Sequence, residues 1–171
     1  KHHAFSPAAA ESIVRGLCLE LINGAHDPAQ LQRIWEELES SERAMPEIAV
    51  PAAQRLAQLG GDGQQVRTWL MPAWDRLSGT AATALPDALA LKAVHALELS
   101  MDGVDDRWLA AIESASQSNP RDARLQYLAA KACLHRELWG KAQHLFTQAA
   151  QQLQDPGLRA CAWRHLAELA E

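Results

Sequence analysis

Residues 119–152, NPRDARLQYLAAKACLHRELWGKAQHLFTQAAQQ, carry the strongest indication of how this chain folds. When the segment 89–120 is shifted onto it by 34 residues, small and apolar positions coincide. Ala96 falls on Ala130, Leu99 on Cys133, Ile112 on Phe146 and Ala115 on Ala149. This coincidence indicates two copies of one structural unit about 34 residues long.

Thirty-four residues is the period of the tetratricopeptide repeat (TPR), a pair of helices joined by a short turn. A small residue midway along the first helix lets the second approach closely, and an aromatic residue with a further small residue fills the groove between them. In the second unit Ala130, Ala142, Phe146 and Ala149 take these roles. We therefore expect an all-α fold, with TPR-like antiparallel helix hairpins forming a right-handed solenoid of about nine helices.

Cap and turn residues divide the rest of the chain into helical blocks. Caps or first-turn prolines that favour helix starts occur at Ser6-Pro7, Asp27-Pro28, Asp62, Asp105 or Asp106, and Asp122. Pro51 predicts a break or a late start in the third helix, Pro72 predicts a kink in the fourth, and residues 80–84 form a small-residue linker.

This division predicts three regions. Residues 1–45 form an N-terminal helical hairpin, a degenerate repeat. Residues 46–84 form a degenerate TPR-like hairpin and linker, and residues 85–171 form two TPR-like hairpins plus a C-terminal capping helix. The six tryptophans, about one per helix, are expected in the core or between repeats.

The charge and cysteine content exclude several classes of protein. The net charge of -5, without a basic cluster, argues against nucleic-acid binding. Cys18, Cys133 and Cys161 form no CxxC pair and lie among Ala and Leu, so we expect reduced thiols in the core. No apolar run is long enough for a membrane span. The chain begins Lys1-His2-His3 without a Met, so we expect a piece of a longer protein or the remnant of a tag, and the two histidines are not treated as ligands.

The segment Leu138-Trp139-Gly140-Lys141-Ala142, preceded by Asn119-Pro120-Arg121-Asp122, resembles the carboxy-terminal region of the bacterial HemY family, and so does the ending 166–171. The resemblance implies a TPR region that follows two membrane-spanning helices, in an inner-membrane protein linked to a late step of haem biosynthesis (porphyrin metabolism). This chain lacks that anchor, as a soluble part of such a protein would. We expect the domain itself to be cytoplasmic.

A TPR array binds its partners on the concave face, which the first helix of each hairpin lines. The repeat register places Arg124, Tyr127, Lys131 and His135 there, with His165 on the last helix and Ala90, Ala93 and Leu97 on the helix that begins near residue 86. A basic groove of this kind suits a carboxylate of a peptide or the propionates of a porphyrin. The alternative is that these basic residues form an ordinary solvated face.

Catalytic and metal-binding signatures are absent from the sequence. There is no nucleophile elbow, phosphate-binding loop or HExxH motif, so no catalytic residue is assigned and no enzyme is expected. His135, His144 and His165 match no standard metal-ligand spacing, which predicts surface histidines and no metal site. Two functions remain. The first is a non-enzymatic scaffold or adaptor for protein–protein interaction, whose partner is a protein such as a haem-synthesis enzyme. The alternative is a porphyrin or haem carrier, the one case in which haem would be a cofactor.

Overall fold

A computed structural model of the chain describes residues 6–78 and 84–171. Within these residues the chain forms eleven α-helices and no strand, which confirms the all-α class. The helices are α1 (Pro7–Asn23), α2 (Pro28–Glu37), α3 (Ser40–Arg43), α4 (Pro46–Gln58), α5 (Gly63–Trp69), α6 (Met71–Leu77), α7 (Asp87–Leu99), α8 (Asp106–Ser118), α9 (Ala123–His135), α10 (Trp139–Gln152) and α11 (Pro156–Leu169). The prediction of about nine is exceeded because α3 follows α2 as a separate turn and α5 is separated from α6.

Short polar side chains begin most of these helices, as the sequence predicts. A carboxylate or hydroxyl oxygen accepts a hydrogen bond from a backbone N–H in the first turn, which satisfies a donor that has no partner inside the helix. The caps are Ser6, Asp27, Asp62, Asp105, Asp122 and Asp155. Pro7, Pro28 and Pro156 occupy the first helical positions, where a missing N–H costs nothing.

The two internal prolines behave differently. Pro72 lies in the first turn of α6, so the predicted kink is a division into two helices. Pro51 lies inside α4, which continues without interruption from Pro46 to Gln58, so the predicted break is wrong. The lost hydrogen bond and the ring clash cost about 3 kcal/mol. Burial of seven α4 side chains against neighbours that include α1 and α7 offsets this cost.

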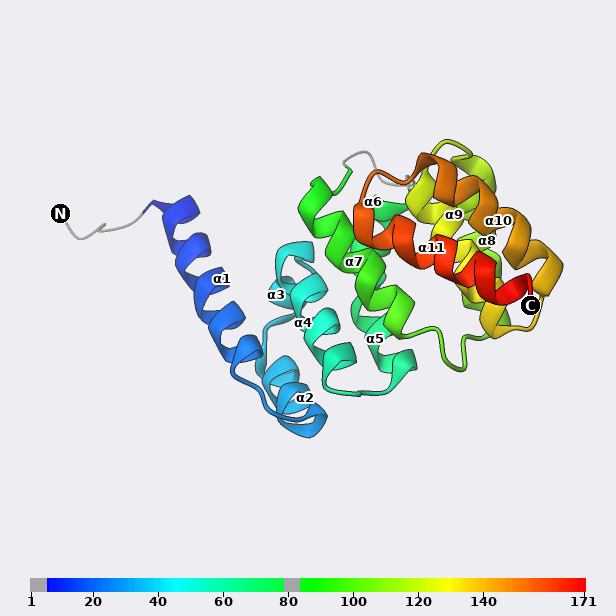
Figure 1. Ribbon diagram of the computed structural model, residues 1–171. Helices are drawn as coiled ribbons and strands as arrows, with labels where there is room; N and C mark the ends of the chain where they lie inside the picture. Colours follow the sequence, from blue (N-terminus) through cyan, green and yellow to red (C-terminus); the bar gives the residue numbers. More distant parts are fainter. Residues whose placement is uncertain (1–5, 79–83) are drawn as a thin grey trace.

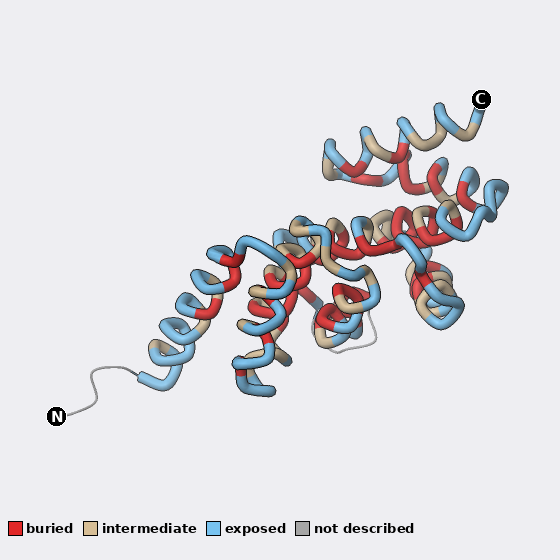
Figure 2. Tube along the Cα trace, turned by 90° about the horizontal axis from the view of Figure 1, so that it is seen from below, coloured by how far each residue is buried: buried red, intermediate tan, exposed pale blue. Residues whose placement is uncertain are grey.

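One hydrophobic core contains buried residues from Cys18 to Ala162. It includes residues from all three predicted regions, on both sides of the boundaries at residues 45 and 85. α4 packs between α1 and α7, α7 also contacts α9, and α9, α10 and α11 stack on one another (Figure 1). Buried residues follow this path through the middle of the molecule, and exposed ones cover both sides (Figure 2). The arrangement is helical and repeat-like. None of the helices in the described part of the chain is long and apolar enough to cross a membrane.

The predicted repeat positions are largely buried. Ala96, Ala130, Ile112 and Phe146 are fully inaccessible to solvent, and Ala115 and Ala149 are buried as well. Leu99 is an exception, because it is exposed at the end of α7 although its counterpart Cys133 is buried. Cys18 and Cys133 are buried free thiols, as expected, and Cys161 is partly buried.

Tryptophans join neighbouring helices in the first half of the fold. The rings of Trp35 and Trp69 stack with centroids 4.4 Å apart, and Trp74 meets Trp108 edge to face at 5.6 Å. The core prediction is wrong for Trp139 and Trp163, which are both 52% exposed.

Three arginines bridge segments that are distant in sequence. Arg55 Nη2 donates to the carbonyl of Ala25 at 2.8 Å, and Arg136 Nη1 donates to the carbonyl of Val104 at 3.2 Å. Arg67, itself only 2% exposed, donates through Nη1 to the carbonyl of Ser100. The carbonyls of Ala25 and Ser100 lie just beyond the ends of α1 and α7, and that of Val104 lies in the α7–α8 connection, so none has an intrahelical donor. His2, His3 and most of the expected linker over 80–84 lie outside the described residues.

Candidate functional site

Helices α7, α9 and α11 run parallel, and side chains meet along their shared face. Asp87 and Arg124, in the first turns of α7 and α9, form an ion pair, and Glu98 and Lys131 pair further along the same two helices. Lys131 Nζ in turn lies 3.3 Å from His165 Nε2 on α11. Lys131 and His165 are 34 residues apart, which is the spacing that the sequence repeat predicts for equivalent positions.

A polar cluster forms at the centre of this face. Tyr127 donates its hydroxyl proton to Glu98 Oε1, and Lys131 Nζ lies 3.7 Å from the same oxygen. The side chains of Lys131, Glu98 and His165 are only 12%, 15% and 19% exposed. The ring of His165 stacks on Phe146 with centroids 4.9 Å apart, and its Nδ1 lies 3.5 Å from Glu168 Oε2.

Burial determines the titration of two members of this polar cluster. Burial, followed by the hydrogen bond to Glu98, raises the pKa of Tyr127, so this phenol is neutral at physiological pH. Burial, followed by the positive charge of Lys131, lowers the pKa of His165. A neutral imidazole can accept a hydrogen bond from the Lys131 ammonium, whereas an imidazolium cannot.

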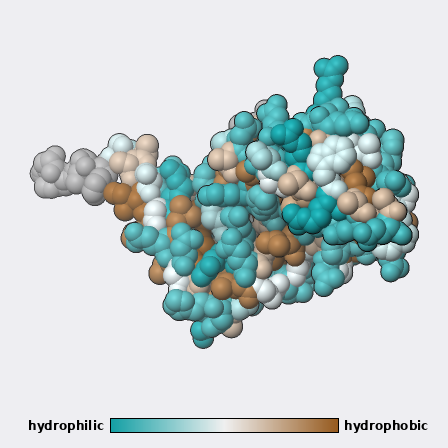
Figure 3. Space-filling view, viewed as in Figure 1, coloured by the Kyte–Doolittle hydropathy of each residue, from teal (hydrophilic) through white to brown (hydrophobic). Residues whose placement is uncertain are grey.

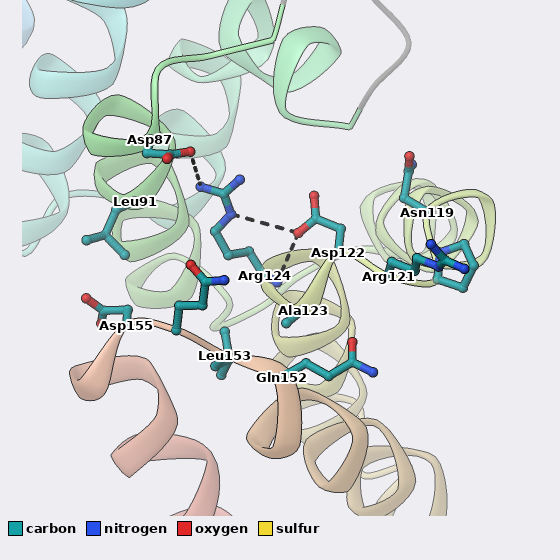
Figure 4. Close-up of a pocket in the computed structure, with 12 residues that line it drawn as sticks. Asp87, Leu91, Asn119, Arg121, Asp122, Ala123, Arg124, Gln152, Leu153 and Asp155 are labelled. Atoms are coloured by element: carbon teal, nitrogen blue, oxygen red, sulfur yellow. Dashed lines mark hydrogen bonds and ion pairs between the residues drawn. The ribbon is translucent and has the colours of Figure 1, made fainter.

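A cavity of about 790 Å³ opens at the N-terminal ends of the same three helices (Figure 4). Arg124 stands in its wall between two carboxylates, with Nη1 3.7 Å from Asp87 Oδ1 and Nε 3.8 Å from Asp122 Oδ1. Both distances exceed hydrogen-bond length. Within the described residues the guanidinium therefore has charge partners but no hydrogen-bond acceptor, and its donors are free for a ligand.

The rest of the cavity lining combines apolar, amide and charged groups, among them a second, exposed arginine, Arg121. Leu91 and Leu153 supply apolar surface, and backbone and amide groups of the α8–α9 and α10–α11 connections complete the wall. Asp122 Oδ1 accepts from the backbone N–H groups of Arg124 and Leu125, and Asp155 caps α11 in the same way. The helix N-termini partly compensate these carboxylates, which leaves Asp87 as the exposed acid beside Arg124.

Four of the five predicted residues belong to the face formed by α7, α9 and α11, but their surroundings differ. Arg124 lines the cavity, while Lys131 and His165 belong to the polar cluster. Tyr127 is fully buried, with its ring edge to face against Phe146 at 5.9 Å, so it supports the face from below. His135 is exposed in the last turn of α9 and has no ion pair or hydrogen bond to another described side chain.

The face of α7 that lines this site differs from the predicted one. Ala90, Ala93 and Leu97 are at most 1% exposed, because α4 packs on α7. Asp87, Leu91, His95 and Glu98 follow at helical spacing on another side of α7, and this side meets α9 and the cavity. The prediction fails on α7 because α4 covers the side that carries these three residues.

Glu98 and Asp87 are site residues that the sequence reasoning missed. Glu98 is the only acid after Asp87 in the helix DALALKAVHALEL. A lone acid in such an apolar helix signals a buried polar contact, since an unpaired buried charge is costly.

The histidines and cysteines form no metal site in the described structure. Over residues 6–78 and 84–171, no three His, Cys, Asp or Glu side chains group closely enough to hold a metal ion. The twelve residues that line the cavity include no His, Cys, Met or Tyr that could ligate haem iron.

Comparisons of the chain with protein-family models, with curated proteins and with solved structures found no match.

Proposed function

We propose that this chain is a non-enzymatic binding module that holds a segment of a partner protein on the face formed by α7, α9 and α11. In this proposal Arg124 binds a carboxylate of that segment, and Leu91 and Leu153 receive a neighbouring apolar side chain. The partner is thus a protein segment in which an acidic residue, or the chain terminus, follows an aliphatic one.

The observation that carries the proposal is the state of Arg124. Its guanidinium is held in the wall of a cavity by ion pairs at 3.7 and 3.8 Å, with no hydrogen-bond acceptor among the described residues. A planar guanidinium matches a carboxylate with two parallel hydrogen bonds. The cavity supplies both this charge and an apolar surface, which is the usual composition of a specific binding site.

The resident carboxylates do not prevent this binding. Asp122 and Asp155 are hydrogen-bonded to helix N-termini. The side chain of Asp87 is 98% exposed, and an ion pair of this kind is worth at most about 1 kcal/mol. Hydrogen bonds to a charged partner contribute about 1.5–3 kcal/mol, so an incoming carboxylate replaces Asp87 at Arg124.

The relationship to the HemY family stays a prediction of the sequence. Under that prediction the partner is an enzyme of haem synthesis, and the chain acts beside the bacterial inner membrane through an anchor that lies outside it. The cavity lining holds no side chain that ligates haem iron, so the proposal is a protein partner.

The test uses fluorescein-labelled hexapeptides that contain Leu-Glu, with matched Leu-Gln and Leu-Lys versions, and measures fluorescence anisotropy. We expect the Leu-Glu peptide to bind at least tenfold more tightly than the other two. Arg124→Ala should weaken its binding by about tenfold or more, since each tenfold is about 1.4 kcal/mol.

The matched control is Arg159→Ala, which removes an exposed arginine from α11 outside the cavity. It should leave the affinity unchanged. Equal affinity for the Leu-Glu and Leu-Gln peptides, full binding by Arg124→Ala, or no binding of any peptide would overturn the proposal.

A further inference from the structure

Helix α1 carries an apolar stripe that nothing in the described structure covers. Ile13, Val14, Leu17 and Leu21 are 43–56% exposed, and they are four of the nine large hydrophobic side chains exposed in the described structure. At 100° per residue these four positions and Ala10 fall on one side of the helix. The charged residues of α1, Glu11, Arg15 and Glu20, lie outside this stripe.

Only one end of α1 is anchored to the molecule. Cys18 and Ile22 are the buried residues of the helix, and they pack into the core beside α4. The preceding turns project away from the other helices (Figure 1), and apolar surface is visible along this arm (Figure 3). Next to the stripe, a groove of about 450 Å³ lies between α1 and α2, and Leu17, Leu21 and Ile34 line it together with Glu20, Gly24 and Gln30.

The two ends of the helical stack therefore differ. At the C-terminal end the outward side of α11 carries Arg159, Arg164 and Ala167, with Trp163 as a single large apolar residue. The outward side of α1 has the opposite composition, which is typical of a surface that is buried in use.

We propose that α1 pairs with α1 of a second copy of this chain in a two-fold symmetric, antiparallel dimer. A two-fold axis near Leu17 places Leu17 opposite itself and Ile13 opposite Leu21, so that each stripe covers the other. The other large exposed apolar residues, Met71, Leu99, Leu138, Trp139 and Trp163, lie on other helices. Among the described helices only α1 offers a complementary stripe, and a second copy supplies it through a self-complementary interface.

The exposed area predicts how tight this dimer is. Four side chains that are about half exposed present roughly 350 Å² of apolar surface per copy, a size typical of functional patches. The two stripes together present about 700 Å², which is below the roughly 1,000 Å² of a stable specific interface and in the range of weak, transient contacts. We therefore expect a weak dimer.

The inference does not depend on the proposed function. The α1 stripe and the cavity beside Arg124 belong to different helices, so the dimer leaves the Arg124 cavity of each copy open. Two cavities in one particle would increase the avidity for a partner that carries two binding segments.

Sedimentation velocity between about 5 and 500 µM tests the dimer. We expect the wild-type sedimentation coefficient to rise from the monomer to the dimer value over this range, while Leu17→Glu stays monomeric at every concentration. Leu99→Glu is the matched control, since it introduces the same charge at an equally exposed position on α7 and should dimerise like the wild type. Circular dichroism confirms that each variant is folded.

A cysteine variant tests the symmetry. In a Cys18→Ser background, Leu17→Cys should form a disulfide-linked dimer on oxidation, whereas Arg15→Cys, outside the stripe, should not. A monomeric wild type at 500 µM, a dimer that survives Leu17→Glu, or no disulfide through Leu17→Cys would overturn the proposal. Adsorption of a monomeric wild type to phosphatidylglycerol vesicles would assign the stripe to a membrane surface instead, and would also overturn it.

Discussion

The ion pair between Glu98 and Lys131 permits a quantitative test of the polar cluster. Lys131→Met keeps most of the side-chain volume but removes the ammonium that lies 3.7 Å from Glu98 Oε1. Removing one partner of a fully buried pair costs about 3–5 kcal/mol, because the remaining charge is left without compensation. Both side chains here keep slight exposure, at 12% and 15%, and Tyr127 still donates to Glu98. We therefore expect a loss of about 2 kcal/mol.

A double-mutant cycle separates this coupling from lost packing. Glu98→Gln leaves the Lys131 ammonium beside His165 without its carboxylate and should cost about 1–2 kcal/mol. The double variant removes both charges, so its loss should be smaller than the sum of the single losses by at least about 1 kcal/mol.

Urea unfolding followed by tryptophan fluorescence gives each free energy of unfolding. Lys92→Met, which removes an exposed lysine from α7, is the control and should change stability by less than about 0.5 kcal/mol. Additive losses in the cycle, or a Lys131→Met variant as stable as this control, would refute the reasoning.

Four further substitutions test other features of the fold. The pKa of His165 is lowered in the folded state, so as the pH falls the unfolded chain takes up the proton first. Between about pH 7 and pH 5 the wild type should therefore lose more unfolding free energy than His165→Gln. Equal losses in urea titrations would contradict this. Gly63→Ala places a Cβ 2.8 Å from the carbonyl oxygen of Ser100 and should lower the free energy of unfolding by about 1–3 kcal/mol. Gly16→Ala places its Cβ where no atom lies within 4 Å. It should raise the melting temperature, because it removes a glycine from a helix interior. Arg67→Met should cost about 1–2 kcal/mol in thermal unfolding, because it leaves that same carbonyl buried without its donor, and an unchanged melting temperature would show that the bond is not needed.

Local signals predict the helices of this protein well. Asp27, Asp62, Asp105 and Asp122 cap helices at the predicted residues, because a cap depends only on hydrogen bonds within a few residues. Pro51 is the instructive exception, since the propensity of one residue is overridden by the burial of a whole helix face.

The site could be predicted only in part, because contacts from distant elements determine it. Lys131 and His165 meet since the repeat period holds between α9 and α11. On α7, however, α4 covers the side that a strict repeat would turn to the groove. The sequence analysis therefore did not predict Glu98 as a site residue. No pattern within α7 indicates that α4 packs against the face of α7 that carries its small residues.

The arginines that reach backward or forward to distant carbonyls affect how the chain opens. Arg55, Arg67 and Arg136 each lie 30–33 residues from the residue whose carbonyl they bind. When one hairpin unfolds, its neighbour therefore loses a donor as well as apolar contact, and nearest-neighbour coupling of this kind makes a helical stack unfold together. The projecting turns of α1 have no such bond from the described side chains. Their amide hydrogens should exchange with solvent by local fraying, while those of α4, α7 and α9 exchange only when the whole stack opens.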